Sequence, residues 1–354
     1  MGTAFAQETE HLEWADILKG LGILTVVWGH AGSKISFYMF WFHMPLFFWI
    51  SGYLYRFKPG ERGSSYLLRK AKHLLIPYVF YLGFLTLIAL AFALWKGQAA
   101  AQFWEQNWQA LLLGGSLLAG VYATFWFPTC LFAVQIVYDV LCRRVSSPVL
   151  KGLLVLGCFL LAYWESRYHA GIFVPWNLDV GLYAIVFYAL GQAMRQNKLL
   201  AGARGRTLVF GISWLIAIGF VYLYAQHILD YGLDMKHRQY YYFGLNLLLP
   251  AAFTLIIVQL SMLLTKIPAV NRGLIGLGKA AMVIMYLHLG FVDAAGHFLA
   301  VTPLRFFALG TVGPLLFYKL IRRVPYGPYL ALGELPKSVG LSGPRSHSYP
   351  TRSL

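Results

Sequence analysis

Three histidines and a lysine lie within long apolar stretches, where an ionisable side chain is costly and marks a functional hypothesis by default. Lys19 and His30 belong to the stretch WADILKGLGILTVVWGHAG. Their spacing of eleven residues corresponds to three helical turns plus about 20°, so both lie on one helix face about 16 Å apart. Asp16, one turn before Lys19, shares that face.

The other two histidines come from separate apolar stretches. His43 precedes Pro45 in FYMFWFHMPLFFWISGYLYRF, and His288 lies within GKAAMVIMYLHLG. If the first two stretches form an antiparallel hairpin, His43 and His30 lie near one level. A neutral histidine close to a hydroxyl can accept its proton, which is worth about 10²–10⁴ in rate. For His43 and His288, a part in chemistry and simple packing both stay open.

Charged groups near the predicted helix ends have two interpretations each. Asp16 and Lys19 form either part of a site or an interfacial ion pair, with Lys19 reaching to water. The cluster of Arg69, Lys70 and Lys72 either holds phosphate groups or serves only as a topology signal.

Aromatic and acidic residues near the opposite helix ends resemble a sugar-binding surface. These are Trp126, Trp176, Asp179 and Tyr183. Sugars bind well between an aromatic face and a carboxylate, but tryptophan and tyrosine also gather at membrane interfaces. The sequence shows no cluster of metal ligands and no phosphate-binding glycine loop, so we expect no metal.

The composition indicates which elements position these residues. Hydrophobic residues make up 59% of the 354 residues and charged ones 12%, against about 25% charged in soluble domains. Lipid-facing surface explains this deficit. The net charge of +16 arises between the apolar stretches and in no RNA-type motif, so we expect membrane lipids as a partner and no nucleic acid.

We therefore predict an all-α, polytopic transmembrane helical bundle of about ten helices. A helix needs roughly 20 mostly apolar residues to cross a bilayer. The predicted spans are 14–33, 37–56, 73–95, 126–142, 149–164, 178–194, 207–226, 243–264, 280–298 and 302–321. The stretch Leu111–Val121 is either re-entrant or interfacial. Lysine and arginine gather in alternate loops, which predicts that both termini are cytoplasmic.

Three segments follow from this reading. Residues 1–13 form a cytoplasmic N-terminal segment, residues 14–321 form one transmembrane domain, and residues 322–354 form a basic tail. The tail is rich in Gly, Pro and Ser, which is typical of disorder.

Several of these motifs resemble one family. Lys-x10-His in the first span, FHMPLFFWISG in the second and the late YLHLG resemble the membrane acyltransferase-3 family, closest to its fucose-4-O-acetylase-like branch. FWFPTCLF and WNLDVGLYAIVFYALG fit the same pattern. Many relatives have arginine where this chain has Lys19, which weakens any argument that needs a bidentate phosphate contact. We expect a stand-alone member without an appended hydrolase-like domain.

The resemblance implies transfer of an acetyl group from cytosolic acetyl-CoA to a carbohydrate hydroxyl. The acceptor would be a cell-surface or exported polysaccharide, or its lipid-linked precursor, at a bacterial inner membrane, with other polysaccharide-assembly proteins as further partners. His30 would act as general base, with Asp16, His43 and His288 nearby in support. Lys19 and the cluster Arg69, Lys70 and Lys72 would hold the donor.

Two other functions compete with this one. A proton-coupled transporter or flippase for a lipid-linked glycan would use the same buried histidines and lysine, but it would move its substrate unchanged. An assembly protein would use them only for packing between helices. Loss of His30 would then reduce folding and leave no specific activity defect.

Overall fold

Helices form almost the whole architecture. The computed structural model describes residues 12–169, 171–240 and 242–334. Within these residues there is no β-strand, only an isolated bridge between Asp234 and Gln239. The predicted all-α bundle is therefore confirmed.

The helices follow one another with short connections. In the first half of the chain they are α1 (Glu13–Gly29), α2 (Ser36–Met39), α3 (His43–Tyr53), α4 (Gly63–Trp95), α5 (Ala100–Leu113), η1 (Gly115–Leu117), η2 (Gly120–Tyr122), α6 (Trp126–Arg144) and α7 (Pro148–Tyr168). In the second half they are η3 (Pro175–Asn177), α8 (Val180–Gln196), α9 (Ala203–Ala225), α10 (Leu245–Leu264), α11 (Pro268–Lys279), α12 (Ala281–Gly296), α13 (Pro303–Ile321) and α14 (Gly327–Leu332).

Several helices are long and apolar enough to cross a bilayer. In the described part of the chain six helical segments meet that requirement, and a seventh is added if α11 and α12, bent by 76° to each other, form one broken span. The chain is thus a multi-pass membrane protein. The number of ten spans stays a prediction, because α1, α3 and α8 have only 17, 11 and 17 residues.

These three shorter helices lie inside the bundle and pack closely. Gly52 of α3 meets the main chain of α8, where a Cβ atom would overlap the carbonyl oxygen of Tyr188. Gly278 of α11 likewise meets the main-chain oxygen of Asp16 in α1. Small residues allow such contacts between membrane helices, and here they bring α1 and α3 into the core.

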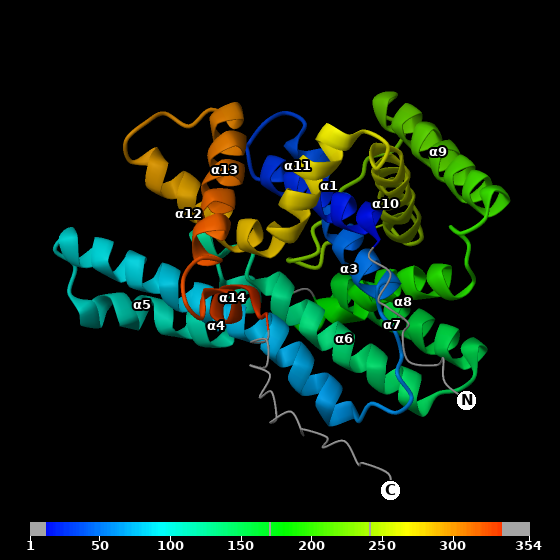
Figure 1. Cartoon of the computed structure of the whole chain (residues 1–354), viewed down its shortest axis with the longest axis horizontal. Coiled ribbons are helices and arrows are strands. Elements are labelled where there is room, and N and C mark those ends of the chain that lie inside the picture. The colour runs from blue at the N-terminus through cyan, green and yellow to red at the C-terminus, as the bar shows by residue number, and fades with distance from the viewer. Residues whose placement is uncertain (1–11, 170, 241, 335–354) are drawn as a thin grey trace, which may run out of the picture.

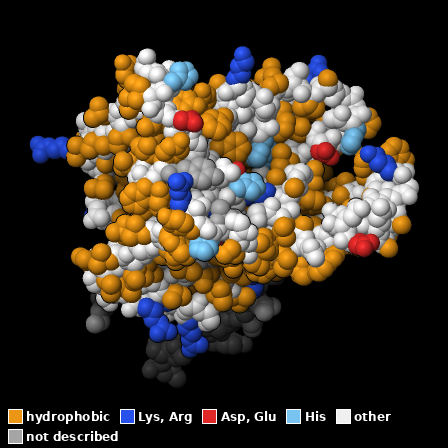
Figure 2. Space-filling view, turned by 180° about the vertical axis from the view of Figure 1, so that it is seen from behind, with side chains coloured by type: hydrophobic (Ala, Val, Ile, Leu, Met, Phe, Trp, Pro, Cys, Tyr) orange, Lys and Arg blue, Asp and Glu red, His pale blue; other side chains and the backbone are white. Residues whose placement is uncertain are grey.

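Outer helices expose apolar side chains instead. On α9 the side chains of Leu208, Leu215 and Ile218 are 64, 73 and 62% exposed. Figure 2 shows hydrophobic side chains over most of one face, with charged ones standing singly among them. Such a surface is stable against lipid and would be costly against water.

The bundle is organised as helix pairs around this core. Figure 1 shows α12 beside α13, α4 beside α5, and α9 beside α10, and each pair is in contact.

We call the end that carries loops 54–62, 145–147 and 197–202 the basic end, and the end that carries loops 30–42, 114–125 and 226–244 the far end. The basic end is the predicted cytoplasmic end.

Two expectations about local structure need correction. The expected span 37–56 is interrupted: α2 ends at Met39, and α3 begins only at His43. Pro45 lies in the first turn of α3, where its missing N–H costs no helical hydrogen bond. In the tail expected to be disordered, Gly327–Leu332 forms α14 and packs on α4, while residues 335–354 lie outside the described residues.

Candidate functional site

The structure brings the three apolar-segment histidines together at the far end. His30 caps the end of α1, His43 begins α3, and His288 lies within α12. The ring centroids of His30 and His288 are 5.3 Å apart. His30 and His43 line one cavity of about 260 Å³. The expectation that His30 and His43 lie near one level agrees with this geometry.

Main-chain carbonyls orient the two flanking histidines. The Nδ1 atom of His43 lies 2.5 Å from the oxygen of Met39, and Nδ1 of His288 lies 2.9 Å from the oxygen of Ile284. A carbonyl oxygen only accepts, so each neutral ring carries its proton on Nδ1 and presents Nε2 as an acceptor. In the described structure Nε2 of His288 is buried without a hydrogen-bond partner.

This arrangement makes the expected supporting role of His43 and His288 more specific. A neutral ring whose Nδ1–H is already donated cannot donate from Nε2 to a developing oxyanion. Both side chains are almost fully buried, with 2 and 0% exposure. Each is better suited to accept a hydrogen bond at Nε2 than to donate one to a substrate.

The loop between α9 and α10 supplies three further polar groups that the sequence argument missed. Asp234, Lys236 and His237 line the same cavity as His30. The Nδ1 atom of His237 lies 2.8 Å from a carboxylate oxygen of Asp234. The only sequence signal was an Asp-x-Lys-His run in a loop that otherwise serves as a connection. The cavity therefore holds an acid–imidazole pair and a cation beside His30.

Ion pairs hold this loop over the cavity. The guanidinium of Arg238 donates to Glu165 of α7 at 2.9 Å and to Asp179, next to α8, at 2.5 Å. The side chain of Asn177 donates to the main-chain oxygen of Lys236 at 2.7 Å. These contacts join residues far apart in the chain and fix the loop against two helices.

Lys236 is the one lysine or arginine among the described residues that line the His30 cavity. Its ammonium donates to the main-chain oxygen of Leu118, which leaves two of its three N–H groups for other partners. Burial lowers the pKa of Lys236, and the carboxylate of Asp234 opposes that shift. The charge of Lys236 also acts on the His30 ring.

The four residues expected to bind a sugar do not come together. Trp126 lines the His30 cavity. Trp176 is 46% exposed and donates from Nε1 to the oxygen of Leu112. Asp179 is engaged by Arg238. Tyr183 is fully buried, donates to the main-chain oxygen of Asn246 and stacks on Tyr240 with centroids 4.2 Å apart.

Asp16 and Lys19 form the expected ion pair within α1. The Lys19 ammonium lies 2.5 Å from a carboxylate oxygen of Asp16. Neither residue lines the His30 cavity. They lie nearer the basic end, so a direct contact with the chemistry at His30 is not supported by the geometry.

A second polar cavity, of about 270 Å³, lies at the basic end. Its lining includes five cations: Arg56, Lys58, Arg69, Lys70 and Arg195. Two of the four residues expected to hold the donor, Arg69 and Lys70, therefore meet there, whereas Lys72 and Lys19 do not line it. Arg56, Lys58 and Arg195 belong to the basic residues that the sequence links only to membrane topology.

A partly buried ion pair holds the loop that carries much of this cavity. Asp139 of α6 pairs with Arg143 at 2.5 Å and accepts from the hydroxyl of Tyr55 at 2.8 Å. Arg143 also donates to the main-chain oxygen of Glu61. Among the described residues no group of three metal-binding side chains comes together.

One comparison with known proteins gives a match. The model of a family described as an acyltransferase domain matches residues 12–321, which is most of the chain. Neither a curated protein nor a solved structure matches this chain. The match covers both polar cavities and every helix from α1 to α13.

Proposed function

We propose, from the premise that this chain belongs to the acyltransferase-3 family of membrane acyltransferases, that it is an O-acetyltransferase of carbohydrates. In this proposal acetyl-CoA is the donor and reaches the protein from the basic end, which faces the cytoplasm. The acceptor is a hydroxyl of a cell-surface or exported glycan. The enzyme lies in a bacterial inner membrane.

The observation that carries this proposal is the His30 cavity. A sugar hydroxyl is a poor nucleophile until a base takes its proton. His30 is a cavity-lining imidazole beside the unpartnered Nε2 of His288. Once protonated, His30 can donate a hydrogen bond to Nε2 of His288 and return its proton to the reacting groups.

Every bond and proton of the acetyl transfer can be followed within this cavity. The hydroxyl oxygen attacks the thioester carbon while His30 takes the hydroxyl proton. The carbonyl oxygen becomes negative, and the ammonium of Lys236 is the donor best placed to stabilise it. The carbon–sulfur bond breaks, and the departing thiolate takes the proton from His30. The products are the acetyl ester and free CoA.

Two features support acetyl-CoA as donor. The five cations of the basic cavity match the negative charge of the nucleotide phosphates. Tyr55 follows α3 at that cavity, and His43 begins α3 at the other. The 11 residues of α3 separate the two cavities by about 16 Å, which an extended pantetheine arm covers.

Two features support a sugar as acceptor. Trp126 offers an aromatic surface in the cavity, and the pair of Asp234 and His237 offers hydrogen-bonding groups near its mouth. The side chain of His237 is 51% exposed, so an acceptor that arrives from outside meets this pair before His30.

The test is acetyl transfer by purified protein. We would measure transfer of labelled acetate from acetyl-CoA to a panel of glycans for the parent, His30→Gln and His169→Ala. We expect His30→Gln to lower kcat by about 10²–10⁴, with unchanged acetyl-CoA binding and melting temperature. His169→Ala, which removes an imidazole outside the cavity, keeps parent activity.

Two results would overturn the proposal. Equal rates for the parent and His30→Gln would remove His30 from the chemistry. If the parent acetylates no glycan but moves an unmodified lipid-linked glycan across a vesicle membrane, the protein is a transporter.

A further inference from the structure

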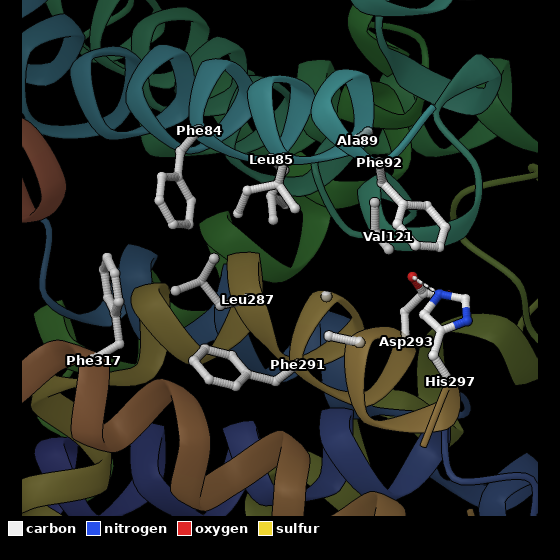
Figure 3. A pocket seen from close by; sticks show the side chains of 13 residues that line it. Phe84, Leu85, Ala89, Phe92, Val121, Leu287, Phe291, Asp293, His297 and Phe317 are labelled. Atoms are coloured by element: carbon white, nitrogen blue, oxygen red, sulfur yellow. Dashed lines mark ion pairs between the residues drawn. The ribbon is translucent and has the colours of Figure 1, made fainter. Parts of the chain in front are cut away.

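An elongated apolar slot lies between α4 and α12, outside the two polar cavities. It encloses about 340 Å³. Figure 3 shows Leu85 and Phe84 of α4 facing Leu287 and Phe291 of α12, with Phe317 of α13 at the same end. Almost every group along its length is aliphatic or aromatic, so the slot suits a hydrocarbon chain.

The opposite end of the slot is polar. Figure 3 shows Asp293 and His297 at that end, with the ring of Phe92 beside them. His297 Nε2 lies 4.0 Å from the Asp293 carboxylate. The ring of Phe92 lies 4.8 Å from that of His297, and the ammonium of Lys96 lies 4.3 Å from the Phe92 centroid. A cation, a ring and an imidazole thus stand in sequence at the mouth.

The slot runs along the direction in which the helices cross the membrane. On α4, Phe84 and Phe92 are eight residues apart, which is about 12 Å along the axis. Lys96 and His297 directly follow the far ends of α4 and α12. The polar mouth therefore lies at the far end of the bundle, and the aromatic end lies at hydrocarbon depth.

The slot and the His30 cavity share a wall. Val121 lines the slot, and Ala123 and Thr124 line the His30 cavity. On α12, Leu287 faces the slot and Met285 the cavity. The hydroxyl of Thr124 donates to the main-chain oxygen of Met285 at 2.7 Å and joins the two halves of the wall.

We propose that this slot holds the hydrocarbon chain of a lipid-linked acceptor, in which the glycan is joined through phosphate to one long chain. The inference rests on the proposed function and names the form of its acceptor. The chain lies between α4 and α12, and the phosphate meets Lys96 and His297 at the mouth. The sugar then reaches over the shared wall to the His30 cavity.

A single chain fits better than a two-chain phospholipid. Gly290 brings α12 close to α4, because a Cβ atom there would lie 3.1 Å from Leu85, and this leaves little width beside the first chain for a second. The ammonium of Lys96 at its mouth matches a phosphate, and the His297 ring can hydrogen bond to one. The Asp293 carboxylate, 64% exposed, can accept hydrogen bonds from the first sugar.

The test fills the slot and leaves the cavity unchanged. Ala89 lines the slot, whereas Ala91 is an exposed residue on the same helix that does not. We would compare Ala89→Phe with Ala91→Phe, using one glycan both free in water and attached to decaprenyl phosphate. Ala294→Phe fills the slot from α12 at an exposed position and serves as a second filling variant.

We expect both filling variants to raise KM for the lipid-linked glycan at least tenfold and to leave KM for the free glycan unchanged. Ala91→Phe should match the parent with both acceptors. Equal changes for the two acceptors, or no change for either, would overturn the slot assignment. If Ala89→Phe folds poorly, Ala294→Phe at its exposed position decides by its binding of decaprenyl phosphate.

A binding measurement separates this inference from the proposed function. Retention of decaprenyl phosphate and of phosphatidylglycerol is measured by native mass spectrometry, without any turnover. Loss of decaprenyl phosphate alone in the filling variants supports the slot even if the parent acetylates no glycan. Loss of both lipids to the same extent would show a general lipid groove and overturn the proposal.

Discussion

The two polar cavities at the ends of α3 are built from different kinds of side chain. At the far end, His43 and His288 are buried and hydrogen bonded to main-chain carbonyls. At the basic end, the lining is mainly long cations, and Arg69 pairs with Glu61 at 2.8 Å while it stays 43% exposed. The far cavity holds its histidine rings in fixed orientations, whereas the basic cavity gathers positive charge on long side chains.

This difference separates two kinds of effect. A group held rigidly beside the reacting atoms acts on the transition state, so its loss lowers kcat. A group that holds a remote part of the donor acts on ground state and transition state alike, so its loss raises KM. Substitutions in the two cavities should therefore give distinct kinetic signatures.

After His30, the largest effect is expected for Lys236, the cation of the far cavity. Loss of one oxyanion donor costs about 10²–10³ in kcat, so Lys236→Met should lower kcat by that factor with little change in KM. Steady-state kinetics with both substrates would check this. Lys34→Met removes an exposed cation of the far end and serves as the control. A rise in KM alone would assign Lys236 to binding.

The same lysine predicts the alkaline side of the pH profile. Burial lowers its pKa, so Lys236 loses its proton, and with it the positive charge, at a lower pH than an ordinary lysine at about 10.4. Activity should accordingly fall as pH rises through that lowered pKa. Arginine stays charged in this range, so Lys236→Arg, if active, should lack that fall.

An intermediate effect is expected in the basic cavity. Lys70→Ala and Arg195→Ala should each raise KM for acetyl-CoA by about tenfold, as for the loss of one charge-assisted contact, with kcat unchanged. Lys72→Ala, a neighbour that does not line the cavity, should match the parent. Added salt should shrink the difference. A fall in kcat at constant KM would contradict a purely binding role.

The sequence was sufficient for the helical bundle and for three histidines that the structure brings together at the far end. Apolar stretches indicated the spans, and ionisable residues within them indicated His30, His43 and His288. Loop 226–244 could not be placed in that way, because its path depends on pairs between Arg238 and residues 59 and 73 positions away. Contacts of that range leave no periodic pattern in the chain.

The residues of the predicted sugar-binding set do not line one cavity, for a related physical reason. Trp126, Trp176, Asp179 and Tyr183 were grouped because all lie near the same ends of the predicted helices. Depth alone does not determine the direction of a side chain around a helix axis. Tyr183 faces the core and Asp179 faces Arg238, so only Trp126 reaches the cavity.

The smallest expected effect separates the two tryptophans of that set. Trp126→Leu removes an aromatic surface from the cavity, and losing about 40 Å² of apolar contact with a sugar costs about 1 kcal/mol, or about fivefold in acceptor KM. Trp176→Leu changes a residue outside the cavity and should leave that KM unchanged. Acceptor titrations at saturating acetyl-CoA measure both. If Trp176→Leu raised the acceptor KM and Trp126→Leu did not, the acceptor would lie over η3, away from His30, and the His30 cavity would then be the donor side alone.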